Sequence, residues 1–354
     1  MPDLPFAIRL SYPSLDAAGL AMLGQRWGAL ERLADASPFQ GWAWIGSAAA
    51  RFGDPVLIAA EDAAGPLGLA LWNRRRSWLR GDSLFLQQSG IPAEDAAFTE
   101  HNDPLLARRA PPGVLAAMLW AAASLPGGPR LVLPGVSAAT AAAAGALGLV
   151  AVPGPDRAAP FADLLAPQDK LSRNTRQQLH RSNRAYAACG PLRIERAASV
   201  AEAHGFLDAL IVLHEATWRS RGKPGAFASP AVMRFHRALV AAGAPDRVEL
   251  LRVRAGPSVV GYLYNLVAGG WACAYQSGFD YPGAPPHGKP GLTSHALAMA
   301  AHRDRGGATY DFLAGPDRYK RSLATGERML HWLAVAPARH PVALMHRVRR
   351  LVGK

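Results

Sequence analysis

The stretch from Tyr275 to Lys320 places an apolar strand, a loop rich in glycine and proline, a helix and a second strand in immediate succession. The loop from Gly283 to Gly291 leads directly into the predicted helix, which extends to about Arg305. Glycine lets backbone N–H groups approach an anion closely, and a helix N-terminus adds partial positive charge. This order of segments therefore predicts a loop that holds the diphosphate of a coenzyme within an α/β sheet.

The loop itself matches no standard phosphate-binding pattern. It contains His287-Gly288-Lys289-Pro290-Gly291, which is neither the Gly-Lys-Ser/Thr of a Walker loop nor Gly-x-Gly-x-x-Gly. Lys289 adds positive charge to the N–H donors of the helix start. An ordinary connection between two elements is the alternative interpretation. The candidate coenzyme-binding residues are His287, Lys289, Gly291, Leu292, Ser294, Tyr319 and Lys320.

Three further residues near this loop are candidate catalytic groups. His295 lies in the first turn of the helix, where the helix dipole favours a neutral imidazole. A neutral base suits amine acylation, because an ammonium ion cannot attack a thioester. Asp311 would orient that base or replace it, and Tyr275 would protonate a departing thiolate. The alternatives are a histidine that only binds the loop, a carboxylate that caps a turn and a tyrosine that packs in a strand.

The rest of the chain predicts a mixed α/β protein with an internal repeat. Hairpin patterns between residues 56 and 88 precede alternating helix and strand patterns up to residue 152. A turn, two strands and Gln-Ser-Gly recur in both halves, ending at Gly90 and at Gly278. The repeat predicts a tandem duplication, with chance similarity between hairpins as the alternative. Pro153-Gly154-Pro155 is the expected boundary between domains, which gives domains 1–155 and 156–354, with the coenzyme site only in the second.

The charge of the chain indicates anionic partners. Lys and Arg exceed Asp and Glu by 39 − 26 = 13, and such a surplus attracts phosphates, nucleic acid or acidic membranes. GC-rich coding is the alternative source of this composition. Two segments concentrate the charge: a helix from Asp169 with basic residues on one face, and an amphipathic helix from His340 to Leu351. Few aromatic residues lie among the basic ones, so the sequence does not predict binding to single-stranded nucleic acid or DNA.

Several other classes of protein do not fit the sequence. The two cysteines, Cys189 and Cys273, have no metal-like spacing, and His214-Glu215 lacks the second histidine of a zinc protease. There is no Gly-x-Ser-x-Gly nucleophile motif. No signal peptide is evident near the N-terminus. We therefore expect a cytoplasmic protein without a metal, with peripheral attachment to the inner membrane as an open possibility.

The C-terminal half of the chain, about Lys170 to Ala336, resembles the GNAT-fold acyltransferases of the CelD/BcsL type, which are relatives of the FemAB/FemX aminoacyltransferases. The matching features, in order, are the Arg-rich helix, Trp218 to Gly222, Tyr275-Gln276-Ser277-Gly278, Pro290-Gly291-Leu292 and Tyr310 through Lys320. The resemblance implies tandem GNAT-like domains and acyl-CoA as the donor. The usual GNAT pyrophosphate pattern, Arg/Gln-x-x-Gly-x-Gly/Ala, is missing, so the details of coenzyme contact are not carried over.

The broad family that this chain resembles also includes bacterial ceramide synthases. That resemblance implies an acyl-CoA N-acyltransferase whose acceptor is a lipid-like long-chain amine, such as a sphingoid base, at the membrane surface. Two rival functions stay open: a Fem-type transferase that uses aminoacyl-tRNA on cell-wall precursors, and a polysaccharide-assembly protein that acylates amino sugars or lacks activity. The basic helices would contact an anionic membrane in the ceramide synthase-like function and RNA in the Fem-type function.

Overall fold

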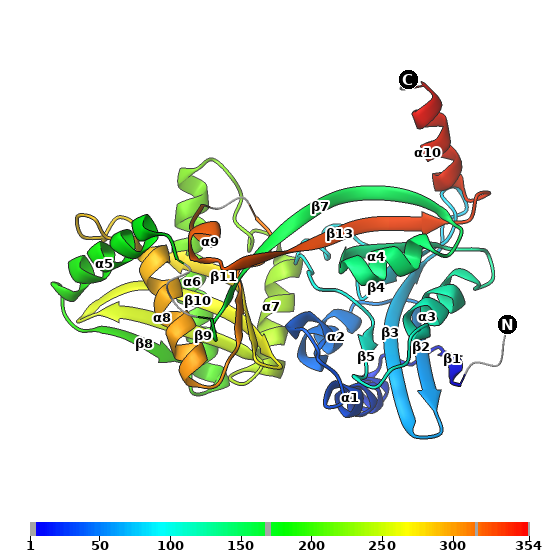
Figure 1. Cartoon of the computed structure of the whole chain (residues 1–354), viewed down its shortest axis with the longest axis horizontal. Coiled ribbons are helices and arrows are strands. Elements are labelled where there is room, and N and C mark those ends of the chain that lie inside the picture. The colour runs from blue at the N-terminus through cyan, green and yellow to red at the C-terminus, as the bar shows by residue number, and fades with distance from the viewer. Residues whose placement is uncertain (1–4, 167–170, 316–317, 353–354) are drawn as a thin grey trace. The chain divides into compact units, whose positions relative to one another are not determined.

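Figure 1 shows the computed structural model, in which residues 5–166, 171–315 and 318–352 are described. The chain forms two compact units. Unit 1 contains residues 1–157 and 329–354, and unit 2 contains residues 158–328. The domains predicted from the sequence, 1–155 and 156–354, stay a prediction, because these units are defined by contacts and divide the chain at two places.

The main sheet of unit 1 has the strand order β1-β2-β3-β4-β6-β13. The first four are antiparallel neighbours, β4 and β6 run parallel, and β13 is antiparallel to β6. A short strand, β5, pairs with β3 outside this path. The elements are β1 (Ala7–Ser11), α1 (Ala17–Glu31), α2 (Trp42–Ala49), β2 (Pro55–Asp62), β3 (Gly65–Arg75), β4 (Ser83–Leu86), β5 (Leu105–Leu106), α3 (Val114–Ala123), β6 (Arg130–Val136), α4 (Ala138–Gly145), β13 (Gly326–Ala336) and α10 (Pro341–Val352).

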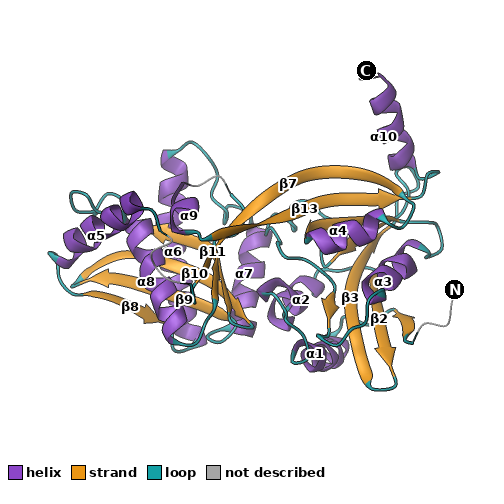
Figure 2. Cartoon of the chain, in the orientation of Figure 1, coloured by secondary structure: helices purple, strands orange, loops and turns teal. Residues whose placement is uncertain are grey.

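Unit 2 repeats this order as β8-β9-β10-β11-β12-β7. Strands β8 to β11 are antiparallel neighbours, β11 and β12 run parallel, and β7 is antiparallel to β12. Figure 2 distinguishes the helices of this unit from its strands. The elements are β7 (Val150–Asp163), α5 (Arg173–Ala187), β8 (Leu192–Arg196), α6 (Val200–Ser220), α7 (Pro230–Gly243), β9 (Val248–Ala255), β10 (Ser258–Ala268), β11 (Trp271–Phe279), α8 (Pro290–Asp304), β12 (Thr309–Asp311) and α9 (Arg318–Leu323).

The two units exchange their last strands. In unit 1, β6 is followed by α4 and then by β7, whose C-terminal end pairs with β12 of unit 2. In unit 2, β12 is followed by α9 and then by β13, which pairs with β6 of unit 1. Each half of the chain therefore completes the sheet of the other half. The mixed α/β class and the tandem arrangement predicted from the sequence are confirmed.

Glycines at matching turns explain the repeat seen in the sequence. Gly65 between β2 and β3 has φ of 120°, and Gly256 between β9 and β10 has φ of 58°. Residues with a side chain rarely adopt such positive φ values, so both tight turns favour glycine. The next hairpin of unit 2 turns through Gly269 and Gly270, also at positive φ, as the most favoured two-residue turn demands.

The predicted domain boundary at Pro153-Gly154-Pro155 lies inside β7 rather than in a loop. Proline cannot donate to a strand ladder and is confined to edges or exposed positions of a sheet. Residues 153–157 of β7 are exposed or half-buried, and its registered pairing with β12 begins only at Phe161. Residues that would break a central strand are therefore tolerated here.

The core of unit 2 fixes the helix predicted from the phosphate-loop pattern. Leu292 and Ala298 of α8 pack with Leu263 of β10 and with Tyr310 and Phe312 at the end of β12. Strand β11 pairs with β12 only from residue 271 to 273 and then continues to Phe279, whereas β12 ends at Asp311. The parallel pair thus opens at its carboxyl ends, which is where α/β sheets place ligands.

Candidate active site

The N-terminus of α8 is held by polar side chains of α5. Ser182 accepts a hydrogen bond from Lys289 N (2.8 Å) and pairs with the Thr293 hydroxyl (2.8 Å), which donates to Asn183 Oδ1 (2.8 Å). The first intrahelical bond runs from Thr293 N to Lys289 O. The N–H groups of Gly291 and Leu292 precede that bond and belong to the positive end of the helix.

A pocket of about 720 Å³ opens beside this helix start. Its lining residues come from α5, α8 and α9 and are Ser172, Asn174, Thr175, Gln178, Lys289, Leu292, Tyr319, Arg321 and Ser322. Lys289 and Arg321 supply positive charge, and the Lys289 ammonium donates to Gln178 Oε1 (2.6 Å). The predicted residue His287 lines a neighbouring pocket of about 210 Å³, together with Lys289 and Arg181. The surface around the loop therefore combines cations with neutral hydrogen-bonding groups, as an anionic ligand requires.

His295 lies directly behind this pocket, with only 1% of its surface exposed. Its ring stacks on Tyr319, a pocket residue, with centroids 5.0 Å apart and an interplanar angle of 16°. Phe279 and Phe312 pack edge-on against the same ring. Burial lowers the pKa of His295 to about 3, with a smaller contribution from the positive charge of Lys320. The imidazole is therefore neutral at physiological pH.

A chain of hydrogen bonds sets the tautomer of His295. The Tyr310 hydroxyl donates to Asn265 Oδ1 (3.3 Å) and lies 3.0 Å from His295 Nδ1. Because its proton points to Asn265, the Tyr310 oxygen accepts from Nδ1–H, which leaves a lone pair on Nε2. Nε2 is buried and has no hydrogen-bond partner among the described residues. His295 thus presents an acceptor with unused capacity.

Asp311 is fully buried at the end of β12. One carboxylate oxygen accepts from Leu313 N (2.8 Å), which holds that residue at a positive φ of 59°. The other oxygen lies 3.4 Å from the Arg328 guanidinium. The Lys320 ammonium donates to the carbonyl oxygens of Leu313 (3.3 Å) and Ala314 (3.1 Å). Asp311 and Lys320 therefore shape the same turn from two sides.

Tyr275 and Ser294, two further predicted site residues, do not line the pocket. Tyr275 lies in another aromatic cluster, with the rings of His236 and Tyr264 5.3 and 5.5 Å away. Ser294 is fully buried near the start of α8, and its hydroxyl has no hydrogen-bond partner in the described part of the chain. The structure therefore groups Lys289, Leu292 and Tyr319 around one pocket, with His295 stacked behind Tyr319, whereas Tyr275 packs elsewhere.

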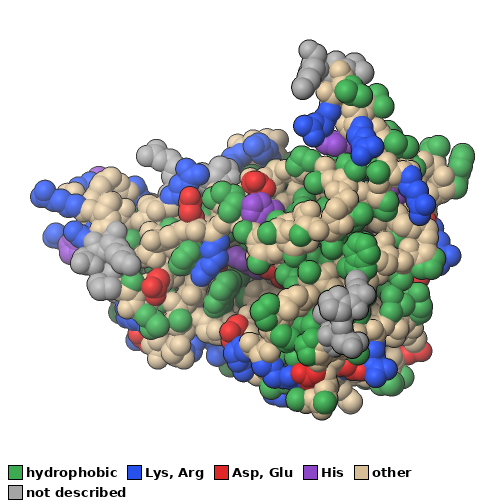
Figure 3. All heavy atoms as spheres, turned by 45° about the vertical axis from the view of Figure 1, so that its right-hand side comes forward, with side chains coloured by type: hydrophobic (Ala, Val, Ile, Leu, Met, Phe, Trp, Pro, Cys, Tyr) green, Lys and Arg blue, Asp and Glu red, His purple; other side chains and the backbone are tan. Residues whose placement is uncertain are grey.

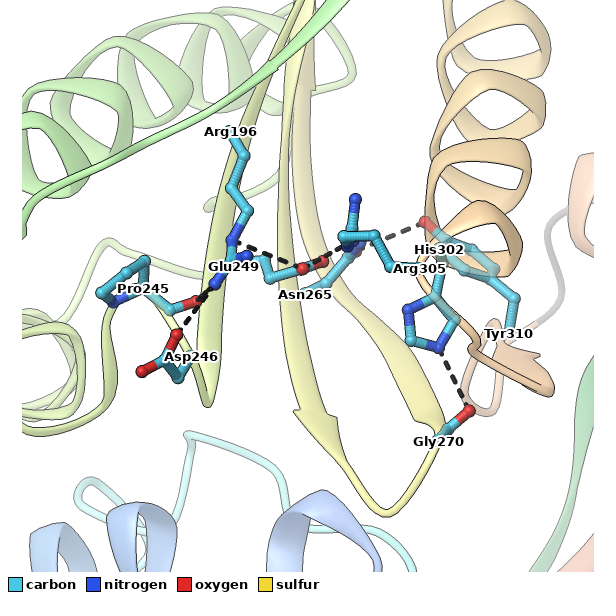
Figure 4. Close-up of polar contacts among 9 residues, drawn as sticks. All are labelled: Arg196, Pro245, Asp246, Glu249, Asn265, Gly270, His302, Arg305 and Tyr310. Atoms are coloured by element: carbon cyan, nitrogen blue, oxygen red, sulfur yellow. Dashed lines mark hydrogen bonds and ion pairs between the residues drawn. The ribbon is translucent and has the colours of Figure 1, made fainter.

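A buried ion-pair network holds the opposite end of α8 (Figure 4). Glu249 on β9 is 3% exposed and pairs with Arg305 (2.6 Å), which directly follows the helix, and with Arg196 of β8 (3.6 Å). His302 in the last turn contacts the Gly270 carbonyl at 3.1 Å. Helix α8 is thus fixed at both ends, and a functional site gains precision from such support.

The depressed pKa of His295 predicts a specific loss of stability in acid. The folded pKa lies below the ordinary value of 6.5, so the unfolded chain takes up the proton first. This stabilising contribution is present above pH 6.5 and is lost progressively as the pH falls toward 3. Going from pH 7.5 to pH 5, the stability advantage of the wild type over His295→Gln should shrink by about 2 kcal/mol. Urea denaturation at both pH values measures this, and a pH-independent difference would contradict it.

The sequence reasoning missed the residues that support the site. In the sequence, Tyr310 and Asn265 stand in strand patterns, and the segment of α5 is distinguished only by its charge. Its basic residues are indeed exposed, as expected of a solvated face: Arg173, Arg176, His180 and Arg184. The face of α5 opposite the basic residues carried the signal for the site. Polar residues recur there at helical spacing: Thr175, Gln178 and Ser182.

Residues 173–321 match a family model described as "Acetyltransferase (GNAT) domain". That range covers α5 through most of α9 and includes most of the pocket lining and the catalytic candidates. The matched range therefore contains a GNAT acyltransferase domain. An acyl-CoA donor is typical of this family. No curated protein matches the chain in a sequence comparison.

Solved structures extend the likeness to the whole chain. FemX is 12% identical with a TM-score of 0.61, covering 91% of this chain and 98% of that one. The C-terminal domain of a candidate lysylphosphatidylglycerol synthetase from Agrobacterium fabrum is 14% identical with a TM-score of 0.56, covering 93% and 97%. L-PGS from Bacillus licheniformis is 10% identical with a TM-score of 0.52, covering 93% and 96%. At such identities the likeness concerns the fold, which is a tandem GNAT-like arrangement.

Proposed function

We propose that the protein is an acyl-CoA-dependent N-acyltransferase that moves an acyl group from a CoA thioester to an amine. The observation that carries this proposal is the cationic pocket at the start of α8, with a neutral histidine directly behind it. Lys289, Arg321 and the N–H groups of Gly291 and Leu292 would bind the diphosphate, because helix N-termini and basic side chains favour phosphate. Tyr319 would line the path from this pocket to His295.

In the proposed reaction, a neutral amine attacks the thioester carbon and thiolate leaves. His295 Nε2 accepts a hydrogen bond from the amine N–H and takes up the proton as the new C–N bond forms. A base with a pKa near 3 is too weak to deprotonate an ammonium ion, but an amine nitrogen becomes far more acidic once it bonds to the acyl carbon. Asn265 and Tyr310 keep His295 in the required tautomer. Asp311 holds the turn next to the ring.

The acceptor that we favour is a lipid-like amine, such as a sphingoid base, which would give a ceramide-type amide. The apolar surroundings of His295, formed by Phe279 and Phe312, suit a neutral amine better than a charged one. The fold likeness to FemX and L-PGS supports a second candidate, the transfer of an aminoacyl group from tRNA. Acylation of an amino sugar in polysaccharide assembly is a third candidate, on the sequence resemblance alone.

An assay of thiol release tests the proposal directly. Purified protein is given acyl-CoA of several chain lengths with sphinganine, glucosamine or no acceptor, and free thiol and amide product are both measured. We expect release that depends on the long-chain amine and matches amide formation. If thiol release never exceeds the no-acceptor rate, whereas aminoacyl-tRNA is consumed with a cell-wall precursor, the second candidate replaces the first.

Lys289 provides a test of the coenzyme site. Lys289→Ala should raise KM for acyl-CoA by about tenfold and change kcat by less than about threefold, because one lost phosphate contact costs about 1–2 kcal/mol. Arg219→Ala, an exposed arginine at the end of α6, is the matched control and should leave KM unchanged. Steady-state kinetics over a range of CoA ester concentrations separate the two constants, and an unchanged KM in Lys289→Ala would remove this lysine from the site.

A further inference from the structure

A basic and aromatic loop projects from unit 1 between β3 and β4. Trp78 is 96% exposed and Leu79 is 66% exposed, whereas large apolar side chains are usually covered at least in part. Arg75 and Arg80 flank them and are also exposed. An almost fully exposed tryptophan beside arginines is characteristic of segments that enter the headgroup region of a membrane.

The base of this loop is joined to the start of α10. Asp82, at the end of the loop, pairs with Arg74 (2.7 Å). Its carbonyl oxygen lies 3.0 Å from Nε2 of His340, the buried residue that immediately precedes α10. Gly81 adopts a φ of 73°, and a side chain at that position would collide with the His340 ring. The loop and the helix therefore leave unit 1 from one common point.

Helix α10 (Pro341–Val352) is the last helix of the chain (Figure 1), and most of its large apolar side chains are exposed. Ala343 is buried, but further along the helix hydrophobic and basic side chains lie side by side on the surface (Figure 3). Leu344, Val348 and Leu351 share one face, at 48, 57 and 78% exposure. The exposed large apolar residues of α10 are Leu344, Met345, Val348 and Leu351.

Charge on α10 is of one sign only. The helix carries Arg347, Arg349 and Arg350 beside the apolar face and contains no Asp or Glu. A short helix with an apolar face and a basic flank lies in the interface plane of a bilayer, with its apolar side among the acyl chains. None of the described helices is long and apolar enough to cross a membrane.

We propose that the Trp78 loop and α10 together form a docking surface for an anionic phospholipid bilayer. Trp78 and Leu79 insert at the headgroup boundary beside the apolar face of α10, and the arginines of both segments bind lipid phosphates. Charge complementarity favours this occupant over a second copy of the chain, because two such surfaces would place like charges together. Four exposed aliphatic side chains on the helix favour it over RNA, which would gain nothing from them.

Sedimentation of the full-length protein with vesicles tests this surface. The probes are vesicles of phosphatidylcholine alone and vesicles that also contain phosphatidylglycerol. We expect strong binding only to the second kind, weakened by salt. The paired changes Trp78→Ser with Leu79→Ser, Leu344→Ser with Val348→Ser, and Arg347→Glu with Arg350→Glu should each reduce binding by about tenfold or more.

Two control variants distinguish binding through this surface from non-specific hydrophobic or electrostatic adsorption to vesicles. Met22→Ser removes another exposed apolar side chain, which is 71% exposed on α1, and Arg219→Glu with Arg234→Glu reverses exposed charge in unit 2. Both should bind vesicles like the wild type. Equal losses in the controls would overturn the proposal, as would the absence of binding to anionic vesicles. The proposal would also be overturned if the docking variants kept vesicle binding and lost only RNA binding, or lost only self-association in analytical ultracentrifugation.

The docking surface does not depend on the proposed reaction. Its residues belong to unit 1, whereas the pocket and His295 belong to unit 2. The docking variants should therefore keep the melting temperature and the rate of thiol release with soluble substrates. Vesicle binding by a protein without transferase activity would contradict the reaction alone, and transferase activity without vesicle binding would contradict the docking surface alone.

Discussion

His295→Gln should lower kcat for acyl transfer by about 100-fold or more and leave KM for the CoA ester nearly unchanged, since losing a positioned proton acceptor costs about 10²–10⁴ in rate. Glutamine is polar and close in size, but its amide cannot take up a proton. His295 lies behind Tyr319 rather than on the pocket surface, so the loss should fall on the chemical step. Single-turnover measurements with the CoA ester separate chemistry from binding.

The pH dependence of this reaction should reflect the ionisation of the acceptor amine and not that of His295. Because burial lowers the pKa of His295 to about 3, the imidazole does not titrate in the neutral range. The value of kcat/KM should therefore rise with pH as the free amine fraction rises, and the curve should move when an amine of lower pKa is used. An inflection near the ordinary pKa of histidine that disappears in His295→Gln would show that the ring is solvated during turnover.

The same helix offers a matched control. His302 is another buried histidine of α8 and contacts the Gly270 carbonyl near the C-terminal end of the helix. His302→Gln makes the same chemical change away from the pocket. It should retain kcat within about threefold, even if it loses some stability. Equal losses of kcat in the two variants would mean that His295 acts only through the stability of α8.

Tyr310→Phe tests whether the hydrogen bonds that link His295 to Tyr310 and Asn265 affect catalysis. The change removes the hydroxyl that lies between His295 and Asn265 and leaves the ring in the core. The imidazole then loses the acceptor that fixed its tautomer. A fall in kcat in this variant with an unchanged KM would identify Tyr310 as a positioning residue, as is found for groups that orient catalytic histidines.

The order of elements was predictable because local rules decide it. Gly65, Gly256 and the Gly269-Gly270 pair occupy turns that demand positive φ, so the hairpins were visible as repeated patterns. The helix after Gly291 was visible for a similar reason, since proline in its first turn and glycine beside it mark a helix start. These rules act over a few residues and need no knowledge of the rest of the chain.

Such local rules could not predict that the two halves of the chain exchange strands β7 and β13. Pro153 and Pro155 indicate a domain boundary in the sequence, yet they lie in β7, whose C-terminal end pairs with Thr309–Asp311, more than a hundred residues away. The support of His295 is equally non-local, since Asn265, Tyr310 and Ser182 come from three separate elements. Propensity describes each residue alone, whereas pairing between distant strands is decided by burial and packing. The candidate coenzyme residues were thus recognisable from the loop, but their neighbours were not.

Arg328→Leu should destabilise the protein by about 1–3 kcal/mol, because it removes a half-buried guanidinium that neutralises a buried carboxylate. The carboxylate of Asp311 is fully buried, and the guanidinium of Arg328 lies 3.4 Å from it. The same guanidinium stacks over Phe161 (3.8 Å) and Trp271 (4.4 Å). Leucine would keep some of this apolar contact but none of the charge.

A second substitution separates the ion pair from the stacking. Asp311→Asn keeps the oxygen that accepts from Leu313 N and removes the negative charge. If the buried charge dominates, the double variant Asp311→Asn with Arg328→Leu should be more stable than Arg328→Leu alone, by about 1–3 kcal/mol. Urea denaturation measures all three variants, with the exposed Arg234→Leu on α7 as a control that should change stability by less than about 0.5 kcal/mol. Purely additive losses in the double variant would instead assign the stability to the contact of Arg328 with the two rings.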